Sequence, residues 1–364
     1  MNNRERILTI LRGETPDQVP WFGDLDYWYH GLLYKDELPE KYMGDGYFTL
    51  NRDLGVGFYL QGYEPYIPVY EGVQVVTTEE DGQRTTTIDT PKGRLQEVQK
   101  FLPTSCSWAY TKHFVEDASD LPAFCYWLEH TSYQPNYDEA RRRQELIGDN
   151  GVTLCYLPRS PFMQMVALYS GIQNLVYMDL DAPDELASTL QLLERKADEA
   201  ALLALNSPAE CLMIPENLSS EVVGVRYYTK YMQPYEERWV ERIHSVGKFS
   251  FIHMDGTLKG LINRVAKVGF RVLEALTPAP VGDLDIEELA AYAGPGPILW
   301  GGLPGVLFTA NVEDGDFDSF VKQVLGIMKQ EPRFVLGVAD QVPPDGLWER
   351  VARVHELVDK YGRY

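Results

Sequence analysis

The second half of the chain alternates short apolar runs with longer amphipathic segments, and this alternation constrains the fold more than any other feature. The runs are rich in β-branched residues, which is typical of buried strands, whereas the longer segments repeat apolar residues at helical spacing. The expected strands are 152–157, 211–215, 248–253, 271–276, 297–300 and 333–337. The expected helices are 161–178, 183–205, 225–246, 258–268, 286–293, 317–329 and 348–361.

Repeated strand–helix units build a parallel sheet whose faces are covered by helices. The two common outcomes are a doubly wound open sheet and a closed (β/α)8 TIM barrel, and we expect the barrel. Residues 1–13 read as a further helix. Residues 44–112 differ, because alternating Val and Thr with turns at 79–82 and 91–93 indicate antiparallel strands. We expect this β-rich stretch to be an insertion within a single domain that spans residues 1–364.

The charge and the cysteine content exclude several classes of protein. The chain has 54 acidic residues against 33 Lys and Arg, a net charge of −21, which disfavours nucleic acid and anionic membrane surfaces as partners. Its 4 cysteines include no CxxC pair, which favours a reducing cytoplasm over a disulfide scaffold. No apolar stretch reaches the roughly 18 residues needed to cross a bilayer, and residues 1–13 lack the features of a signal peptide.

His253 and Asp255 are the first candidates for chemistry. They lie where an apolar strand runs into polar residues, and side chains two positions apart on a strand point the same way. Both would project from the C-terminal mouth of a barrel, where active sites of this fold lie. An imidazole beside a carboxylate can hold a metal or act as an acid/base pair. The alternative is that Asp255 belongs to a turn and bonds to His253.

Further polar residues follow neighbouring strands. Glu216 and Asn217 follow the strand at 211–215, and Asp340 follows the strand at 333–337. Together with His253 and Asp255 they could surround one metal ion, and their oxygen ligands would favour a harder metal than thiolates do. Glu216 is also a candidate acid or base, because no basic residue is near it in sequence. The alternative for Asp340 is an ordinary loop carboxylate.

Two features indicate ligand binding less directly. Arg159 stands beside Ser160 and Pro161, a pair typical of a helix start, and a helix N-terminus with an arginine can receive an anion. Helix capping alone also explains the pair. Aromatic residues gather in the N-terminal third, where they suit a flat ligand, a homodimer interface or a mixed core. The usual signatures of nucleotide binding and serine hydrolysis are absent from the sequence.

The order of several motifs resembles the uroporphyrinogen decarboxylase superfamily, which includes corrinoid-linked methyltransferases. The motifs are RERILTILRGETPDQVP at 4–20, Ser160-Pro161-Phe162, FIHMDG at 251–256, WGGLP at 300–304 and GVADQVPPD at 337–345. The resemblance implies a TIM barrel with its ligand site at the C-terminal mouth. True decarboxylases carry an arginine-rich segment near the N-terminus, whereas the matching residues 21–42 here contain no arginine. The methyltransferase branch is therefore the closer match.

That branch holds zinc through a His-x-Cys pair and a distant cysteine. His253 matches the histidine, while Asp255 and Asp340 stand at the two cysteine positions. The resemblance implies a site for Zn2+ or another divalent metal on His253, Asp255 and Asp340, with Glu216 as a further candidate ligand. Asp255 and Glu216 are the expected catalytic residues, and Arg159, Asn217 and Trp300 the expected substrate-binding residues.

The expected function is metal-assisted transfer of a methyl group between a small substrate and a corrinoid, carried on a separate protein. Two alternatives stay open. One is a carboxy-lyase of the uroporphyrinogen decarboxylase type, acting on a carboxylated cyclic substrate with Asp255 or Glu216 as a metal-free acid/base. The other is a non-catalytic binder of a corrinoid or tetrapyrrole.

Overall fold

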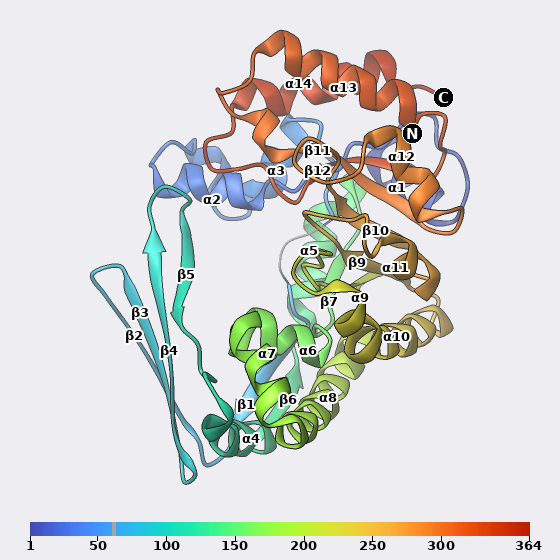
Figure 1. The fold of residues 1–364 in the computed structure, drawn as a ribbon. Helices are drawn as coiled ribbons and strands as arrows, with labels where there is room; N and C mark the ends of the chain where they lie inside the picture. The colour runs from blue at the N-terminus through green and yellow to red at the C-terminus, as the bar shows by residue number, and fades with distance from the viewer. Residues whose placement is uncertain (60–62) are drawn as a thin grey trace.

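A six-stranded parallel sheet forms the centre of the computed structural model, which describes residues 1–59 and 63–364 (Figure 1). The strand order is β12-β11-β10-β9-β8-β7. The strands are β7 (Leu154–Tyr156), β8 (Cys211–Ile214), β9 (Phe249–His253), β10 (Val272–Leu276), β11 (Ile298–Pro304) and β12 (Phe334–Ala339). All six predicted strands are confirmed, and β8, β10, β11 and β12 are buried along their whole length. That burial explains why they read as continuous apolar runs rather than as alternating ones.

Helices follow the strands as the sequence predicts, with two interruptions. The helices of this half are α6 (Pro161–Gln164), α7 (Gly171–Asp181), α8 (Pro183–Leu205), α9 (Gly224–Tyr227), α10 (Gln233–Ser245), α11 (Ile262–Val268), α12 (Ile286–Ala293), α13 (Asp314–Met328) and α14 (Trp348–Tyr361), with a 3-10 turn at Gly305–Phe308. The predicted helix at 161–178 is broken by a π-helical turn, Met165–Tyr169, and by Gly171 at a φ of 75°. A second π-helical turn, Tyr228–Met232, interrupts the predicted helix at 225–246. The spacing of apolar residues along the sequence does not reveal a change of helix type that lasts a single turn.

Two short extended segments lie between the edges of the sheet. Trp21 forms a single parallel bridge with Leu336 of β12, and Phe58 forms one with Gly151, just before β7. The Gly57 N–H donates to the Trp21 carbonyl over 2.9 Å, so backbone contacts run from β12 through both segments to β7.

The described residues thus do not form the eight regular strands that we expected for a closed barrel. The sheet has six strands, and its remaining contacts are single bridges. One physical reason is Pro20, whose carbonyl accepts from Leu336 but which has no N–H to extend the ladder. Residues 60–62, which fall within the predicted insertion, lie outside the described residues.

A compact apolar cluster fills one face of the sheet. It draws side chains from all six strands and from both extended segments, namely Phe22, Tyr59, Leu154, Cys211, Met213, Phe251, Val272, Ile298, Trp300 and Val335. The helix α1 (Asn3–Leu11) adds Ile7, Ile10 and Leu11 to this cluster. Arg271, just before β10, donates to the Leu11 carbonyl, which places α1 across the N-terminal ends of the strands. Helix α1 therefore covers the cluster at the N-terminal ends of the strands, and the C-terminal ends are the opposite end of the sheet.

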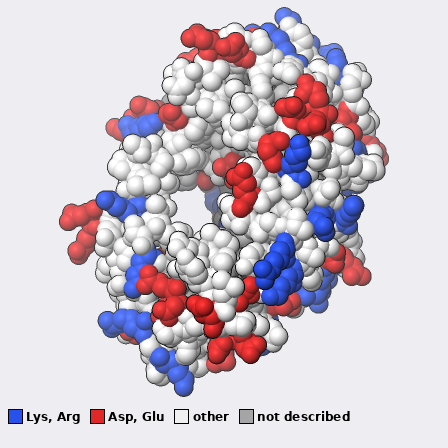
Figure 2. Space-filling model, in the orientation of Figure 1, with Lys and Arg blue, Asp and Glu red and all other residues white. Residues whose placement is uncertain are grey.

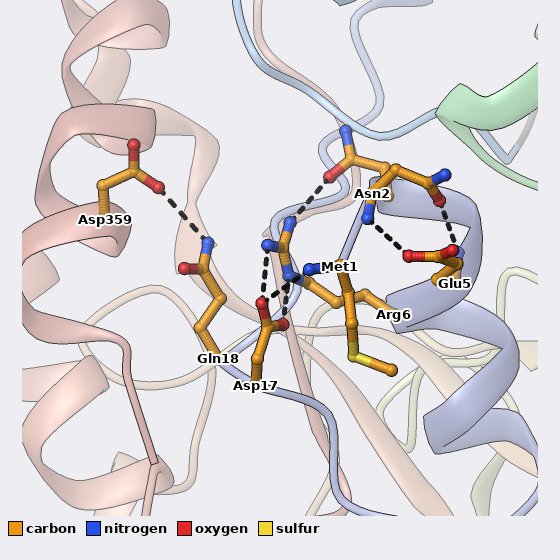
Figure 3. A network of polar contacts seen from close by, with 8 residues as sticks. Met1, Asn2, Glu5, Arg6, Asp17, Gln18 and Asp359 are labelled. Carbon is orange, nitrogen blue, oxygen red and sulfur yellow. Dashed lines mark hydrogen bonds and ion pairs between the residues drawn. The ribbon is translucent and has the colours of Figure 1, made fainter.

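Helix α1 is fixed in place by a polar network (Figure 3). Asn2 and Glu5 form a reciprocal capping box at its start. Arg6 donates two hydrogen bonds to Asp17, of 2.6 and 3.1 Å. The next residue, Gln18, donates a hydrogen bond to Asp359 of α14. The network ties the first turn of the chain to the last helix.

The N-terminal third contains the antiparallel region. A four-stranded meander consists of β2 (Gln74–Glu80), β3 (Gln83–Thr90), β4 (Gly93–Leu102) and β5 (Ser107–Lys112), while β1 (Tyr66–Tyr70) pairs with β6 (Thr131–Pro135). The other elements are α2 (Asp26–Tyr34), α3 (Gly46–Asp53), α4 (Leu121–Glu129), α5 (Tyr137–Ile147) and 3-10 turns at Glu40–Tyr42, Ala118–Asp120 and Gly148–Asn150. The predicted strands are confirmed over Gln74–Lys112, but the first residues of the expected insertion form α3 instead.

The meander stands away from the sheet, and its far end contacts α2 through Tyr34 and Phe101, whose ring centroids are 5.0 Å apart (Figure 1). An opening passes through the molecule in the orientation of Figure 2. Among the described residues, no helix is long and apolar enough to cross a membrane.

Candidate functional site

His253 is the last residue of β9 and stands next to Glu274 of β10 in the parallel register. Its Nδ1 lies 2.6 Å from Glu274 Oε2, and both side chains are buried. Tyr59 donates its hydroxyl to the other Glu274 oxygen over 2.7 Å. Glu274 thereby fixes the orientation of the imidazole and leaves Nε2 facing away from it. A carboxylate behind a histidine is the usual arrangement at protein metal sites, since it sets the tautomer and raises the basicity of the ligand.

Asp255 and Asp340 complete a cluster with His253. One ligand atom from each of the three residues lies within 4.8 Å of the other two. The His253 Nε2 to Asp340 Oδ1 distance is 3.7 Å, too long for a hydrogen bond but suitable for two ligands on one ion. Asp340 has a φ of 65°, a backbone conformation that Asp and Asn tolerate better than most residues. Three of the predicted metal ligands thus converge.

The cluster is rich in negative charge. Burial would lower the pKa of His253, but Glu274, with help from Asp340 and Asp255, raises it to about 9. Burial raises the pKa of Asp340, against the effect of His253, and Asp255 raises it further. Asp24 is also buried, and burial together with the neighbouring carboxylates, including Glu274 and Asp340, raises its pKa well above the usual range. The three carboxylates of Glu274, Asp255 and Asp340 around one imidazole favour a bound cation, which would displace the imidazolium proton.

Glu216 lies outside this cluster. It is fully buried after β8, where one carboxylate oxygen accepts the Ser160 N–H over 2.9 Å. The other oxygen has no hydrogen-bond partner among the described residues. Burial raises the pKa of Glu216 to about 7, against the hydrogen bonds from Ser160 and the charge of Arg159. The structure therefore does not bring the proposed fourth ligand to the His253–Asp255–Asp340 cluster, although a pKa near 7 suits Glu216 to act as an acid or base at neutral pH.

The raised pKa of Glu216 predicts a pH dependence of stability. Because the folded pKa of about 7 exceeds the ordinary glutamate pKa of 4.5, the folded state binds more protons, and the free energy of unfolding falls as the pH rises between these values. Glu216→Gln keeps an acceptor for Ser160 and should remove this loss, on the order of 3 kcal/mol. Urea unfolding at pH 5 and pH 8 measures the difference in the free energy of unfolding. Equal pH slopes for the variant and the native protein would contradict the assignment.

The three predicted substrate-binding residues occupy different surroundings. Arg159 is half-buried and lines a cavity beside the sheet. Asn217 is exposed, at a φ of 51°. Trp300 is fully buried in the interior cluster. Its Nε1 donates to the Phe22 carbonyl over 3.1 Å, and its ring centroid lies 4.3 Å from that of Tyr59. A substrate could reach Trp300 only by displacing its neighbours, so the structure gives this residue a packing role beneath the metal cluster.

Sequence reasoning missed Glu274, Asp24 and Tyr59. Glu274 had a visible signal, because it is an acidic residue inside the otherwise apolar run of β10, and a buried carboxylate needs a partner. Asp24 and Tyr59 had none. Both lie in the short extended segments, which have no recognisable strand pattern.

Two comparisons with known proteins gave a match. The family model described as uroporphyrinogen decarboxylase (URO-D) matches residues 134–361, more than half of the chain. The chain belongs to the URO-D family. Among solved structures, a methyltransferase from Methanosarcina mazei is similar, with a TM-score of 0.63, 14% sequence identity and 99% of each chain covered. At this identity the likeness shows a shared fold. Comparison with curated proteins gave no match.

Proposed function

We propose that this protein is a metal-dependent methyltransferase of the URO-D family, which moves a methyl group between a small substrate and a corrinoid carried on a partner protein. The observation that carries the proposal is the His253–Asp255–Asp340 cluster with Glu274 behind the histidine. The similar Methanosarcina structure, a methyltransferase, supports the same choice within the family.

The residues present fit a divalent ion such as Zn2+. His253 would supply Nε2, because its Nδ1 is held by Glu274, and Asp255 and Asp340 would each supply a carboxylate oxygen. A bound metal of this kind acts as a Lewis acid and lowers the pKa of a coordinated group. The oxygen-rich donor set favours a harder ion than a thiolate set would.

The chain's own residues hold and orient this site. Glu274 fixes the imidazole ring, and Tyr59 in turn fixes Glu274. The interior cluster beneath keeps water away from the buried side of His253, whose side chain is 10% exposed. Asp255 and Asp340 are more open, and they face the side from which a substrate would arrive. The excess of carboxylates argues against the polycarboxylate substrate of true decarboxylases.

We further propose that the six strands and the two extended segments together act as a closed barrel. All eight contribute side chains to one interior cluster, as the strands of a TIM barrel do. In this arrangement the metal cluster lies at the C-terminal mouth, where the corrinoid partner would dock.

The test is a metal analysis joined to a methyl-transfer assay. Protein purified without chelator should contain close to one divalent ion per chain, and it should transfer a methyl group from methylcobalamin to a small thiol. Removal of the metal should abolish the transfer, and its return should restore it. A protein that takes up no divalent ion, or whose transfer survives complete metal removal, would refute the proposal.

A further inference from the structure

A cavity lies between the β1–β6 pair and helices α4 and α8, and none of His253, Asp255 and Asp340 is among the residues that line it. Its volume is about 180 Å³. A cavity of roughly 150 Å³ holds one benzene molecule, so this space suits a ligand of that size and is far too small for a corrinoid. Arg159 after β7 and Pro215 after β8 line it, which places it at the same end of the sheet as His253.

Five of the residues that line it are aromatic, and their rings stand at steep angles to one another. Tyr66 and Tyr133 meet at 84°, and Trp127 and Tyr169 meet at 85°. Tyr70 is inclined by 50° to Trp127. Parallel walls would suit a flat ring, whereas walls that face inward from several directions suit a compact rounded group. Aromatic faces attract cations, and cages of this kind recognise methylated ammonium groups.

The same cavity carries one negative and one positive side chain. Glu64 and Arg159 both line it, and the buried Nε of Arg159 has no hydrogen-bond partner among the residues that the structure describes. Glu64 is an exposed residue, and the partial desolvation of its carboxyl raises its pKa while the charge of Arg159 lowers it, so the two groups influence each other. Two opposite charges that share a cavity without pairing leave room for a ligand that carries both signs.

We propose that this cavity binds a small zwitterion, an N-methylated amino acid whose quaternary ammonium lies in the aromatic wall near Glu64 and whose carboxylate lies on Arg159. The cage of Tyr66, Tyr133, Trp127 and Tyr169 supplies the cation–π attraction, and the guanidinium supplies the anion contact. This inference goes beyond the proposed function and does not depend on it, since the binding site is complete without the metal cluster.

Calorimetric titration of the full chain with three probes tests it. N,N,N-trimethylglycine carries both charges, 3,3-dimethylbutanoate has the same shape without the positive charge, and choline lacks the carboxylate. Trimethylglycine should bind about tenfold or more tightly than either analogue, since each analogue loses one charged contact. Equal binding of 3,3-dimethylbutanoate, or no binding of trimethylglycine up to roughly 10 mM, would overturn the proposal.

Variants of the cavity residues test which side chain contacts each charged group of the ligand. Glu64→Gln should weaken trimethylglycine and choline but not 3,3-dimethylbutanoate, whereas Arg159→Gln should weaken the two carboxylates but not choline. Tyr133→Phe keeps the ring and should keep binding, while Tyr133→Leu should lose about tenfold in affinity. The double variant Asp255→Asn/Asp340→Asn should bind trimethylglycine as the native protein does. Loss of binding in this last variant would place the ligand at the metal cluster and overturn the separate site.

Discussion

The double variant Asp255→Asn/Asp340→Asn is expected to fold normally and to lose more than about 100-fold in affinity for Zn2+. Both substitutions keep the shape of the side chain and remove one negative charge each from the cluster around His253. Asn also tolerates the φ of 65° at position 340. The loss of two charged ligands leaves only His253, and changes even in groups behind the ligands cost 10- to 100-fold. Competition with a fluorescent zinc chelator measures the change.

A matched control separates this loss from a general effect of charge. Asp36 and Asp81 are exposed residues with φ values of 59° and 49°, similar to that of Asp340, and Asp36→Asn/Asp81→Asn makes the same change in charge. This control should bind zinc as the native protein does. Thermal unfolding of the site variant and the control checks that both are folded. Equal zinc affinity in the two variants would contradict the metal site.

The sequence predicts the convergence of His253, Asp255 and Asp340 because these residues follow regular strands. His253 ends β9 and Asp340 follows β12, so knowing where the strands end and that they are parallel is enough to place both residues at one mouth. Glu216 follows β8 by the same logic, yet its side chain turns to Ser160. Strand position gives the end of the sheet at which a residue lies, but it does not give the rotamer that decides which neighbour the residue meets.

The sequence predicts the elements whose apolar residues repeat over many positions. It does not predict the segments that are held to the sheet by single contacts. Helix α8 has the predicted bounds, because its 23 residues repeat their apolar positions over several turns. The segments at Trp21 and Phe58 are each held to the sheet by one bridge and carry no repeat. Their position depends on distant partners, Leu336 and Gly151, which the local sequence does not reveal.

The contact between Phe58 and Gly151 is therefore the best place to test how the sheet is completed. A Cβ added at Gly151 would lie 1.8 Å from the Phe58 carbonyl oxygen. The obstacle is backbone, so it cannot move aside as a side chain could, and the φ of 168° at Gly151 is an extended conformation open to any residue. Gly151→Ala should thus break the hydrogen bonds of 2.9 and 3.0 Å that Phe58 makes with the chain around Gly151.

We expect Gly151→Ala to lower the free energy of unfolding by about 3 kcal/mol or more, and the apparent Tm by roughly 6 to 12 °C. Gly296→Ala is the control, because a Cβ there meets nothing within 4 Å, and its effect should stay within about 0.5 kcal/mol. Thermal and urea unfolding followed by circular dichroism measure both. Tyr59 adjoins the broken bridge and holds Glu274, so zinc affinity should fall with stability in Gly151→Ala alone. A Gly151→Ala protein as stable as the control would mean that the bridge between Phe58 and Gly151 does not hold the sheet together.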